Sequence, residues 1–128
     1  MRYLLDTCSF VWLCAEPARL GARAIQALES ADAEILLSDV SVLELALKWQ
    51  AGKITLPKPP RAWIDEQARA WHCSMVALKR SAIYRSSELP ALHRDPFDRL
   101  LVATAIEDGM TLITPDSIVQ RYPVAWIW

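Results

Sequence analysis

Four acidic residues of this 128-residue sequence stand at positions whose types and spacing suit metal chemistry. Asp6 directly follows the first short apolar run, and Asp116 comes just after a later one. Glu44 lies inside the most apolar predicted helix, whereas Asp98 lies in the first turn of the clearest predicted helix. If the apolar runs are parallel strands, their carboxyl ends share one rim of the sheet, where proteins of this class bind ligands. We therefore expect the four carboxylates to converge at one rim.

Such a cluster of carboxylates needs a counter-charge. Two like charges about 4 Å apart repel by roughly 4 kcal/mol at an effective dielectric constant near 20. A divalent cation removes this repulsion, and oxygen ligands favour Mg²⁺ or Mn²⁺ over softer metals. An ion of this kind provides Lewis-acid and water-activating chemistry for hydrolysis of a phosphodiester. Zinc is disfavoured, because the only histidines, His72 and His93, have no paired ligand at helical spacing.

Two of these acids also have purely structural interpretations. Asp6 could cap a helix that follows it, with Ser9 three residues later. Glu44 could belong to a capping box that starts at Ser41, or it could form an ion pair with Lys48 one helical turn away. The apolar neighbours of Glu44 argue against a fully solvated position and favour a functional role.

The segment around Asp98 is a strong helix start by itself. Asp95 is suited to the N-cap and Pro96 to the first helical position, while Asp98 places an acid in the first turn. Thr114, two residues before Asp116, begins a weaker version of the same device. Taken one at a time, none of these acids decides the function.

Short apolar runs alternate with helical patterns along the chain. Strands are predicted over residues 3–5, 34–37, 74–78, 111–113 and 124–127, the last at an edge of the sheet. Helices are predicted over residues 11–14, 18–28, 40–51, 62–71, 81–87 and 96–107. This alternation predicts an α/β protein with a parallel sheet.

The composition describes a globular protein with one domain, residues 1–128. Hydrophobic residues make up 53% of the chain and charged residues 23%, which is unlike a disordered protein. The net charge of −1 leaves no basic surface of the kind that marks many nucleic-acid binders. A nonspecific DNA coater is thereby disfavoured, whereas a nuclease with a few local basic groups remains open.

Cysteine content and hydropathy indicate a cytoplasmic protein. Cys8, Cys14 and Cys73 lack metal-site spacing, and their odd number argues against a disulfide framework. Asp6 follows two leucines, so no signal peptide is apparent. No apolar run approaches the roughly 18 residues of a membrane span. We therefore expect no membrane association.

Taken together, the motifs resemble the PIN-domain toxins of the VapC group. They are Leu4-Leu5-Asp6-Thr7, Ser38 through Glu44-Leu45-Ala46 with Lys48, His93-Arg94-Asp95-Pro96-Phe97-Asp98-Arg99, and Leu112-Ile113-Thr114-Pro115-Asp116. The block that starts at His93 is the most specific of them. The resemblance spans essentially the whole chain, because the motifs follow in the family's order and spacing.

The resemblance implies a fold, a site and partners. The fold would be a three-layer α/β/α sandwich around a mainly parallel five-stranded sheet. Asp6, Glu44, Asp98 and Asp116 would hold one or two Mg²⁺ or Mn²⁺ ions, and Thr114 would orient a carboxylate or a water at the metal. The protein would be an endoribonuclease toxin that hydrolyses transfer or ribosomal RNA. A VapB-like antitoxin would inhibit it, and it would form a homodimer.

Four cations are candidates to hold the RNA backbone: Lys48, Lys53, Arg94 and Arg99. We give Arg99 the most weight, because it directly follows the acid Asp98. Asp95 is expected to cap its helix and to support the metal site indirectly. Trp12 could line an apolar groove for a partner helix or peptide, and stacking on RNA bases is open to one of the six tryptophans.

Two residues depart from the family pattern or lack a clear place in it. Cys8 stands where many relatives have histidine, which could alter the substrate rim. Asp39 is expected to be the N-cap of the helix that carries Glu44. The alternative function is a non-catalytic PIN-fold binding or scaffold protein, which the complete set of acids argues against. A phosphohydrolase for small esters is disfavoured, because no glycine-rich phosphate loop is present.

Overall fold

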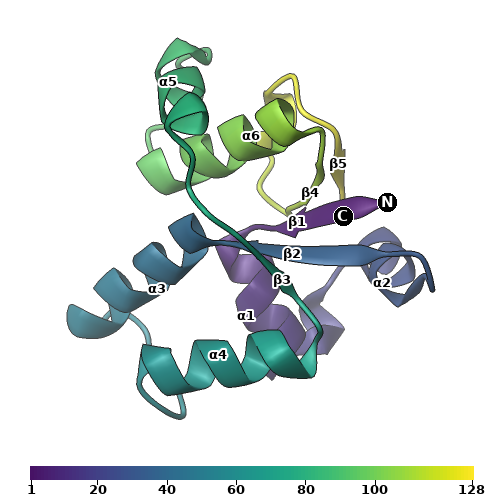
Figure 1. Cartoon of the computed structure of the whole chain (residues 1–128), viewed down its shortest axis with the longest axis vertical. Coiled ribbons are helices and arrows are strands. Elements are labelled where there is room, and N and C mark those ends of the chain that lie inside the picture. The colour runs from purple at the N-terminus through teal and green to yellow at the C-terminus, as the bar shows by residue number, and fades with distance from the viewer.

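The computed structural model describes all residues, Met1–Trp128, with strands and helices in alternation (Figure 1). The strands are β1 (Arg2–Leu5), β2 (Glu34–Ser38), β3 (Ser74–Val76), β4 (Thr111–Ile113) and β5 (Trp126–Ile127). The helices are α1 (Thr7–Ala15), α2 (Ala22–Glu29), α3 (Asp39–Gln50), α4 (Pro60–Ala70), α5 (Arg80–Glu88) and α6 (Pro96–Asp108). Two short 3₁₀ helices, η1 (Pro17–Arg19) and η2 (Val119–Arg121), complete the chain.

The five strands form one sheet in the order β3-β2-β1-β4-β5, and every pair is parallel. Leu4 in the central strand β1 is in register with Leu36 of β2 and Leu112 of β4. Parallel neighbours need crossover connections, and helices supply them here. The predicted α/β fold with a five-stranded parallel sheet is confirmed, and β5 lies at an edge as expected.

Alternate residues of the central strand feed two separate hydrophobic clusters. Leu4 packs with Val102 and other residues of α5 and α6 on one face of the sheet. Tyr3 and Leu5 pack with Phe10 and other residues of α1, α2 and α4 on the opposite face. Figure 1 shows α5 and α6 on one side of the sheet, with α1 and α4 on the other. The arrangement is the expected three-layer sandwich, because side chains alternate across a strand.

The first helical region differs from the prediction. α1 begins at Thr7 rather than at residue 11, because Asp6 caps it directly after β1. The single helix predicted over residues 18–28 is wrong. The backbone is extended at Leu20 and Gly21, which separates η1 from α2.

Helix α3 also begins differently from the prediction. The side chain of Ser38 accepts a hydrogen bond from the Val40 N–H at 3.0 Å, so Ser38 is the N-cap. The expected N-cap role of Asp39 is therefore wrong, and Asp39 occupies the first turn. The reason is that β2 runs through Ser38, whose extended backbone supplies the cap geometry.

None of the helices combines the length and apolar character that crossing a bilayer requires.

Candidate metal centre

Asp6 joins the central strand to the helix that follows it. Its backbone N–H donates to the Ile113 carbonyl at 3.1 Å, while its side chain accepts from the Ser9 N–H at 2.8 Å. The side chain is buried, and this burial raises the pKa of the carboxyl, although hydrogen bonds from Ser9 and Thr114 oppose the rise. Asp6 thus has both predicted features: it caps α1, and it lies at the carboxyl end of β1.

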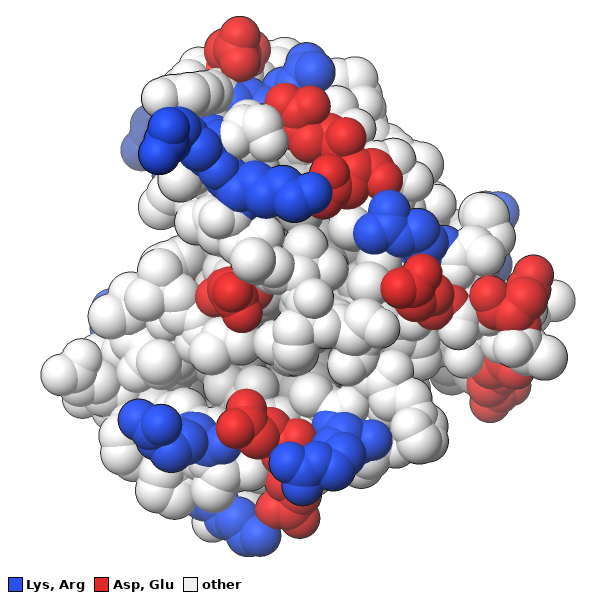
Figure 2. Space-filling view, in the orientation of Figure 1, with Lys and Arg blue, Asp and Glu red and all other residues white.

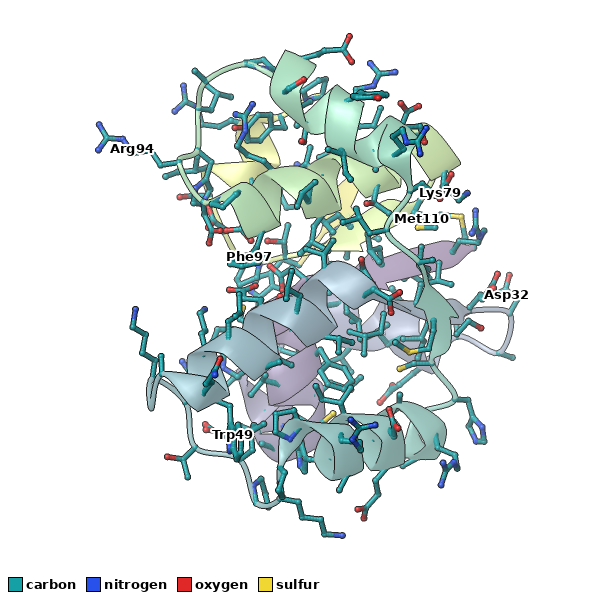
Figure 3. All side chains as sticks on the ribbon, turned by 60° about the vertical axis from the view of Figure 1, so that its left-hand side comes forward. Asp32, Trp49, Lys79, Arg94, Phe97 and Met110 are labelled. Atoms are coloured by element: carbon teal, nitrogen blue, oxygen red, sulfur yellow. The ribbon has the colours of Figure 1, made fainter.

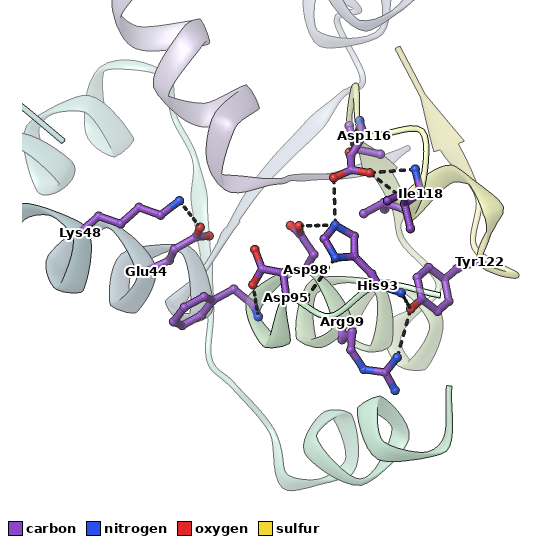
Figure 4. Close-up of polar contacts among 12 residues, drawn as sticks. Glu44, Lys48, His93, Asp95, Asp98, Arg99, Asp116, Ile118 and Tyr122 are labelled. Carbon is purple, nitrogen blue, oxygen red and sulfur yellow. Dashed lines mark hydrogen bonds and ion pairs between the residues drawn. The ribbon is translucent and has the colours of Figure 1, made fainter. Parts of the chain in front are cut away.

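Glu44 is a buried acid on α3 with one oxygen paired and one free. Its Oε2 accepts a hydrogen bond from Lys48 Nζ at 2.6 Å, which is the ion pair expected one turn along the helix. Its Oε1 is buried and has no hydrogen-bond partner (Figure 4). The alternative capping box at Ser41 is wrong, because α3 already begins at Asp39. A buried carboxylate oxygen without a partner is costly unless a cation satisfies it.

Helices α1 and α3, which carry these two acids, are held together at their first turns. The Thr7 hydroxyl donates to Ser41 Oγ at 3.0 Å, and both residues are buried. This bond fixes the start of α1 against the helix that carries Glu44, one turn beyond Ser41. Asp6, the N-cap of α1, and Glu44, on α3, therefore line the same pocket.

Asp98 lies in the first turn of α6, as predicted. Asp95 is the N-cap, and its Oδ1 accepts from the Phe97 N–H at 2.9 Å, with Pro96 directly after it. At the other end, Gly109 takes a left-handed conformation (φ 64°) that stops the helix. Burial, followed by the charges of Asp95 and Asp6, raises the pKa of Asp98 to about 7.

Asp116 follows β4 and is the most strongly anchored of the acids. Its Oδ1 accepts from the Ile118 N–H at 2.8 Å and from the Val119 N–H at 3.1 Å. Its own N–H donates to Thr114 Oγ1 at 3.1 Å. Partial burial acts to raise the pKa of Asp116, but the bonds from His93 and the two backbone N–H groups outweigh it and lower the pKa. Thr114 is fully buried, as a residue that positions Asp116 requires.

His93 joins two of the acids, and the prediction did not assign it a role at this site. Its Nε2 lies 3.1 Å from Asp98 Oδ2 and 3.1 Å from Asp116 Oδ2 (Figure 4). Its Nδ1 accepts the Asp95 N–H at 3.1 Å, so a neutral ring carries its proton on Nε2. The three side chains offer ligand atoms within 4.8 Å of one another, a group that could hold a metal ion. The sequence did offer one indication of this role, because His93 is the first residue of the most specific motif.

The four predicted acids line a single pocket with a volume of about 440 Å³. Asp95 and Lys48 line it as well, so five carboxylates face one basic residue. The remaining wall is made by Thr7, Cys8, Val11, Trp12, Leu45, Ile54 and Pro115. The excess of acid over base, together with the free oxygen of Glu44, suits a divalent cation with hard oxygen ligands.

The predicted RNA-binding cations fall into different environments. Lys48 lines the pocket, and its pKa is raised mainly by its hydrogen bond to Glu44. The Arg99 guanidinium instead donates to the Ser86 carbonyl at 2.6 Å, to two further carbonyls and to the Tyr122 hydroxyl at 3.1 Å. Successive helical residues point about 100° apart, so Arg99 does not follow Asp98 into the pocket. The geometry gives no support to an RNA role for Arg99.

Arg94 and Lys53 do not line the pocket. Arg94 is exposed and extends away from the body of the protein (Figure 3). On the face drawn in Figure 2, lysines and arginines form small groups, with uncharged residues and some acids between them. That face carries no continuous basic surface, in agreement with the net charge of −1.

The fold and the acidic pocket define a class of protein that the family comparison identifies. The family model described as the PIN domain matches residues 3–125. The chain therefore belongs to the PIN domain family. The fold expected from the resemblance and the family itself are both confirmed.

Individual relatives extend this assignment. The chain is 39% identical over 120 residues to Ribonuclease VapC22 of Mycobacterium tuberculosis (strain ATCC 25618 / H37Rv), covering 93% of this chain and 90% of the relative. A crystal structure of VapBC2 from Rickettsia felis, bound to a DNA fragment from their promoter, aligns with a TM-score of 0.75 and 19% identity, covering 100% of this chain and 99% of that one. DNA-bound VapBC from Salmonella typhimurium aligns with a TM-score of 0.69 and 14% identity, covering 99% and 97%. The two solved structures show a shared fold.

Proposed function

We propose that this PIN-domain protein is a divalent-metal-dependent endoribonuclease that acts as a toxin and is inhibited by an antitoxin protein. The observation that carries the proposal is the pocket in which Asp6, Glu44, Asp98 and Asp116 meet from four different segments of the chain. The relative that is 39% identical over most of the chain is a ribonuclease of the VapC kind.

The residues present fit Mg²⁺ or Mn²⁺. All four acids offer hard oxygen ligands, and Glu44 Oε1 is buried without a partner. Asp6, Glu44, Asp98 and Asp116 would hold one or two ions, directly or through water. An ion held there supplies Lewis acidity that activates water and neutralises charge on the phosphodiester.

The surrounding residues hold this acidic set in place. His93 keeps Asp98 and Asp116 close together through its Nε2. Thr114 anchors the backbone of Asp116, and Asp95 caps α6 while its charge raises the pKa of Asp98. Lys48 is about half exposed, so its ammonium can serve both Glu44 and an RNA phosphate.

The proposed function also implies a substrate and an inhibitor. We take the substrate to be transfer or ribosomal RNA and the inhibitor to be a VapB-like protein. One structural neighbour, from Klebsiella pneumoniae, is a toxin–antitoxin complex with a TM-score of 0.63. We also take the chain to act as one domain, since both hydrophobic clusters pack on the same sheet. Its three free cysteines suit the cytoplasm.

A homodimer is part of the proposal. Leu43 and Leu47 on α3 are 48% and 46% exposed, and Ile83 and Tyr84 on α5 are 45% and 61% exposed. Large apolar side chains left in solvent are typical of surfaces that bind another protein. The oligomeric state at micromolar concentration, measured by light scattering, tests this part.

Cleavage of total RNA with mapping of the new ends tests the main proposal. The wild-type protein should cut at discrete positions with Mg²⁺ or Mn²⁺ and stop cutting when EDTA is added. Asp6→Asn should be inactive, whereas Asp65→Asn, which changes an exposed acid on α4, should cut as the wild type does. Folded wild-type protein that cuts no RNA with either ion would instead favour a non-catalytic PIN-fold scaffold.

A further inference from the structure

The pocket is lined by two chemically different sets of residues. Besides the acids, the lining includes five hydrophobic residues, which we call the apolar wall: Val11, Trp12, Leu45, Ile54 and Pro115. Metal binding and phosphodiester chemistry account for the acids. They do not account for the wall, because phosphate and ribose are polar. A nucleobase is the part of an RNA substrate with a flat, weakly polar face that such a wall can bind.

Trp12 is the only aromatic side chain in this wall, and contacts from two other segments hold it. The guanidinium carbon of Arg19 lies 4.1 Å from the centre of the Trp12 ring. The ring of Trp128 lies 5.8 Å away at an angle of 56°. The half-buried Trp12 is thus fixed before any ligand binds, which lowers the entropic cost of stacking on it.

Gly21 explains how Trp128 reaches this position. A Cβ at residue 21 would lie 2.5 Å from the carbonyl carbon of Trp128 and 2.8 Å from its indole ring. Any side chain at residue 21 would force Trp128, the neighbour of Trp12, to shift. Glycine at residue 21 therefore allows Trp128 to pack against Trp12, the tryptophan that lines the acidic pocket.

We propose that Trp12 is a substrate-binding residue that stacks on an unpaired nucleobase next to the cleaved phosphate. Trp12 lies six residues after Asp6, about 9 Å along the helix axis. The base it contacts therefore belongs to a nucleotide at or beside the reacting bond. Stacking on an aromatic ring requires a base outside a duplex, so the substrate is single-stranded at this point.

Arg19 adds a positive charge beside this ring. Its side chain is 53% exposed, and its ion pair with Glu16, 3.7 Å long, is exposed as well. The guanidinium is therefore free to contact the phosphate of the stacked nucleotide while it stays over Trp12. This inference rests on the proposed ribonuclease function and adds the part of the RNA that the apolar wall recognises.

A protein segment is the other class of occupant for an apolar wall. The observations favour the nucleobase, because Trp12 lines the same pocket as Asp6, Glu44 and Asp98. An RNA strand whose phosphate binds among these acids therefore has a neighbouring base close to the apolar wall. Antitoxin binding is therefore measured as a separate outcome.

The test combines a protein change with a substrate change. An oligoribonucleotide that contains the mapped cleavage site is compared with versions that lack one base beside the cleaved bond. Trp12→Leu should lower kcat/KM on the intact oligonucleotide by about 5- to 150-fold, the range for loss of one stacked base. Trp12→Phe should retain most of the activity. On the oligonucleotide that lacks the stacked base, wild type and Trp12→Leu should be nearly equal.

Two controls separate stacking from folding and from metal binding. Trp49→Leu changes a tryptophan at the end of α3 that is 42% exposed and outside the pocket, and it should leave kcat/KM unchanged (Figure 3). The Mn²⁺ affinity of Trp12→Leu should match that of the wild type, and circular dichroism should show a folded protein even where loss of the contacts with Arg19 and Trp128 lowers the melting temperature. On an inactive Asp6→Asn background, Trp12→Leu should weaken binding of the same oligonucleotide by a similar factor, which needs no turnover.

Several results would overturn the inference while leaving the ribonuclease proposal intact. One is an equal loss for Trp12→Leu on the intact and the base-lacking oligonucleotides. Another is wild-type activity that is indifferent to removal of every base near the cleaved bond, a measurement that needs no variant. A third is unchanged RNA kinetics with weakened antitoxin binding, which would make the wall a protein-docking surface. Wild-type protein without any ribonuclease activity would instead overturn the proposed function.

Discussion

His93 and Asp116 are 23 residues apart in sequence, yet His93 Nε2 is 3.1 Å from Asp116 Oδ2. The same nitrogen is 3.1 Å from Asp98 Oδ2. One ring therefore holds together two acids that come from different elements, α6 and the segment after β4. Because Nδ1 of the ring is engaged by the Asp95 N–H, the orientation of the ring is set by the backbone at the start of α6.

His93→Asn should weaken Mn²⁺ binding about 10- to 100-fold, the usual loss when a group that orients metal ligands is removed. The shorter side chain cannot contact both acids at once, so they separate. Titration calorimetry with Mn²⁺ measures the effect. His72→Asn is the matched control, since His72 is exposed and has a positive φ of 53°, which Asn tolerates. Unchanged affinity in His93→Asn would show that the acids need no such link.

The cap and the metal-ligand roles of Asp6 can be separated by two substitutions. Asp6→Asn keeps an oxygen for the Ser9 N–H, so the metal-free protein should be as stable as the wild type or more stable. Relief from a buried charge acts in the same direction, because burial raises the pKa of Asp6. Asp6→Ala should cost about 1 kcal/mol of unfolding free energy.

Both Asp6 variants should lose RNA cleavage. Urea unfolding with EDTA and a cleavage assay on the same preparations measure the two effects. Retained activity in Asp6→Asn, or an Asn variant much less stable than the Ala variant, would remove Asp6 from the metal site.

The metal-free protein should lose stability as the pH rises from about 4 to 7. The pKa of Asp98 is raised to about 7 by burial and then by Asp95 and Asp6, from an ordinary value of 3.8. The folded state therefore binds this proton more tightly than the unfolded state, and the stabilisation is complete only below the unfolded pKa. It is lost as the pH rises through 7, with a slope of at most about 1.4 kcal/mol per pH unit.

Asp98→Asn should remove this part of the pH dependence, because the amide does not titrate. Asp65→Asn, which changes an exposed acid, should keep the full slope. Urea unfolding in EDTA across pH 4.5 to 8, as about seven separate curves, gives the slopes. Mg²⁺ affinity of the wild type should rise over the same interval, since a carboxyl must be deprotonated to bind a metal. Identical slopes in wild type and Asp98→Asn would contradict the raised pKa.

Divalent cations should stabilise the folded protein through Glu44. A ligand at about 100 times its Kd adds roughly 2.7 kcal/mol to the free energy of unfolding. Mg²⁺ or Mn²⁺ should therefore raise the melting temperature of the wild type, and should raise it less in Glu44→Gln, because Oε1 of Glu44 is the buried oxygen without a partner. Glu88→Gln, at an exposed position on α5, should respond as the wild type does. Equal shifts in all three proteins would show that Glu44 does not bind the ion.

The sequence alone was enough for several interactions that lie within one turn of helix. Asp95 as the cap of α6, Pro96 after it, and the pairing of Glu44 with Lys48 all involve residues at most four apart. Local chain geometry decides such contacts, so residue type and spacing predict them. The alternation of short apolar runs with helices likewise predicted the parallel α/β sheet.

Contacts between residues far apart in sequence were decided only by the tertiary structure. The extended backbone before α2 includes Gly21, which lies against Trp128 from the far end of the sequence. The place of His93 depends on Asp116, which reaches it from beyond β4. Arg99 turns from the pocket because carbonyls in the last turn of α5 and just after it accept hydrogen bonds from its guanidinium. In each case the partner comes from another element, and only the packing of helices on the sheet brings the two together.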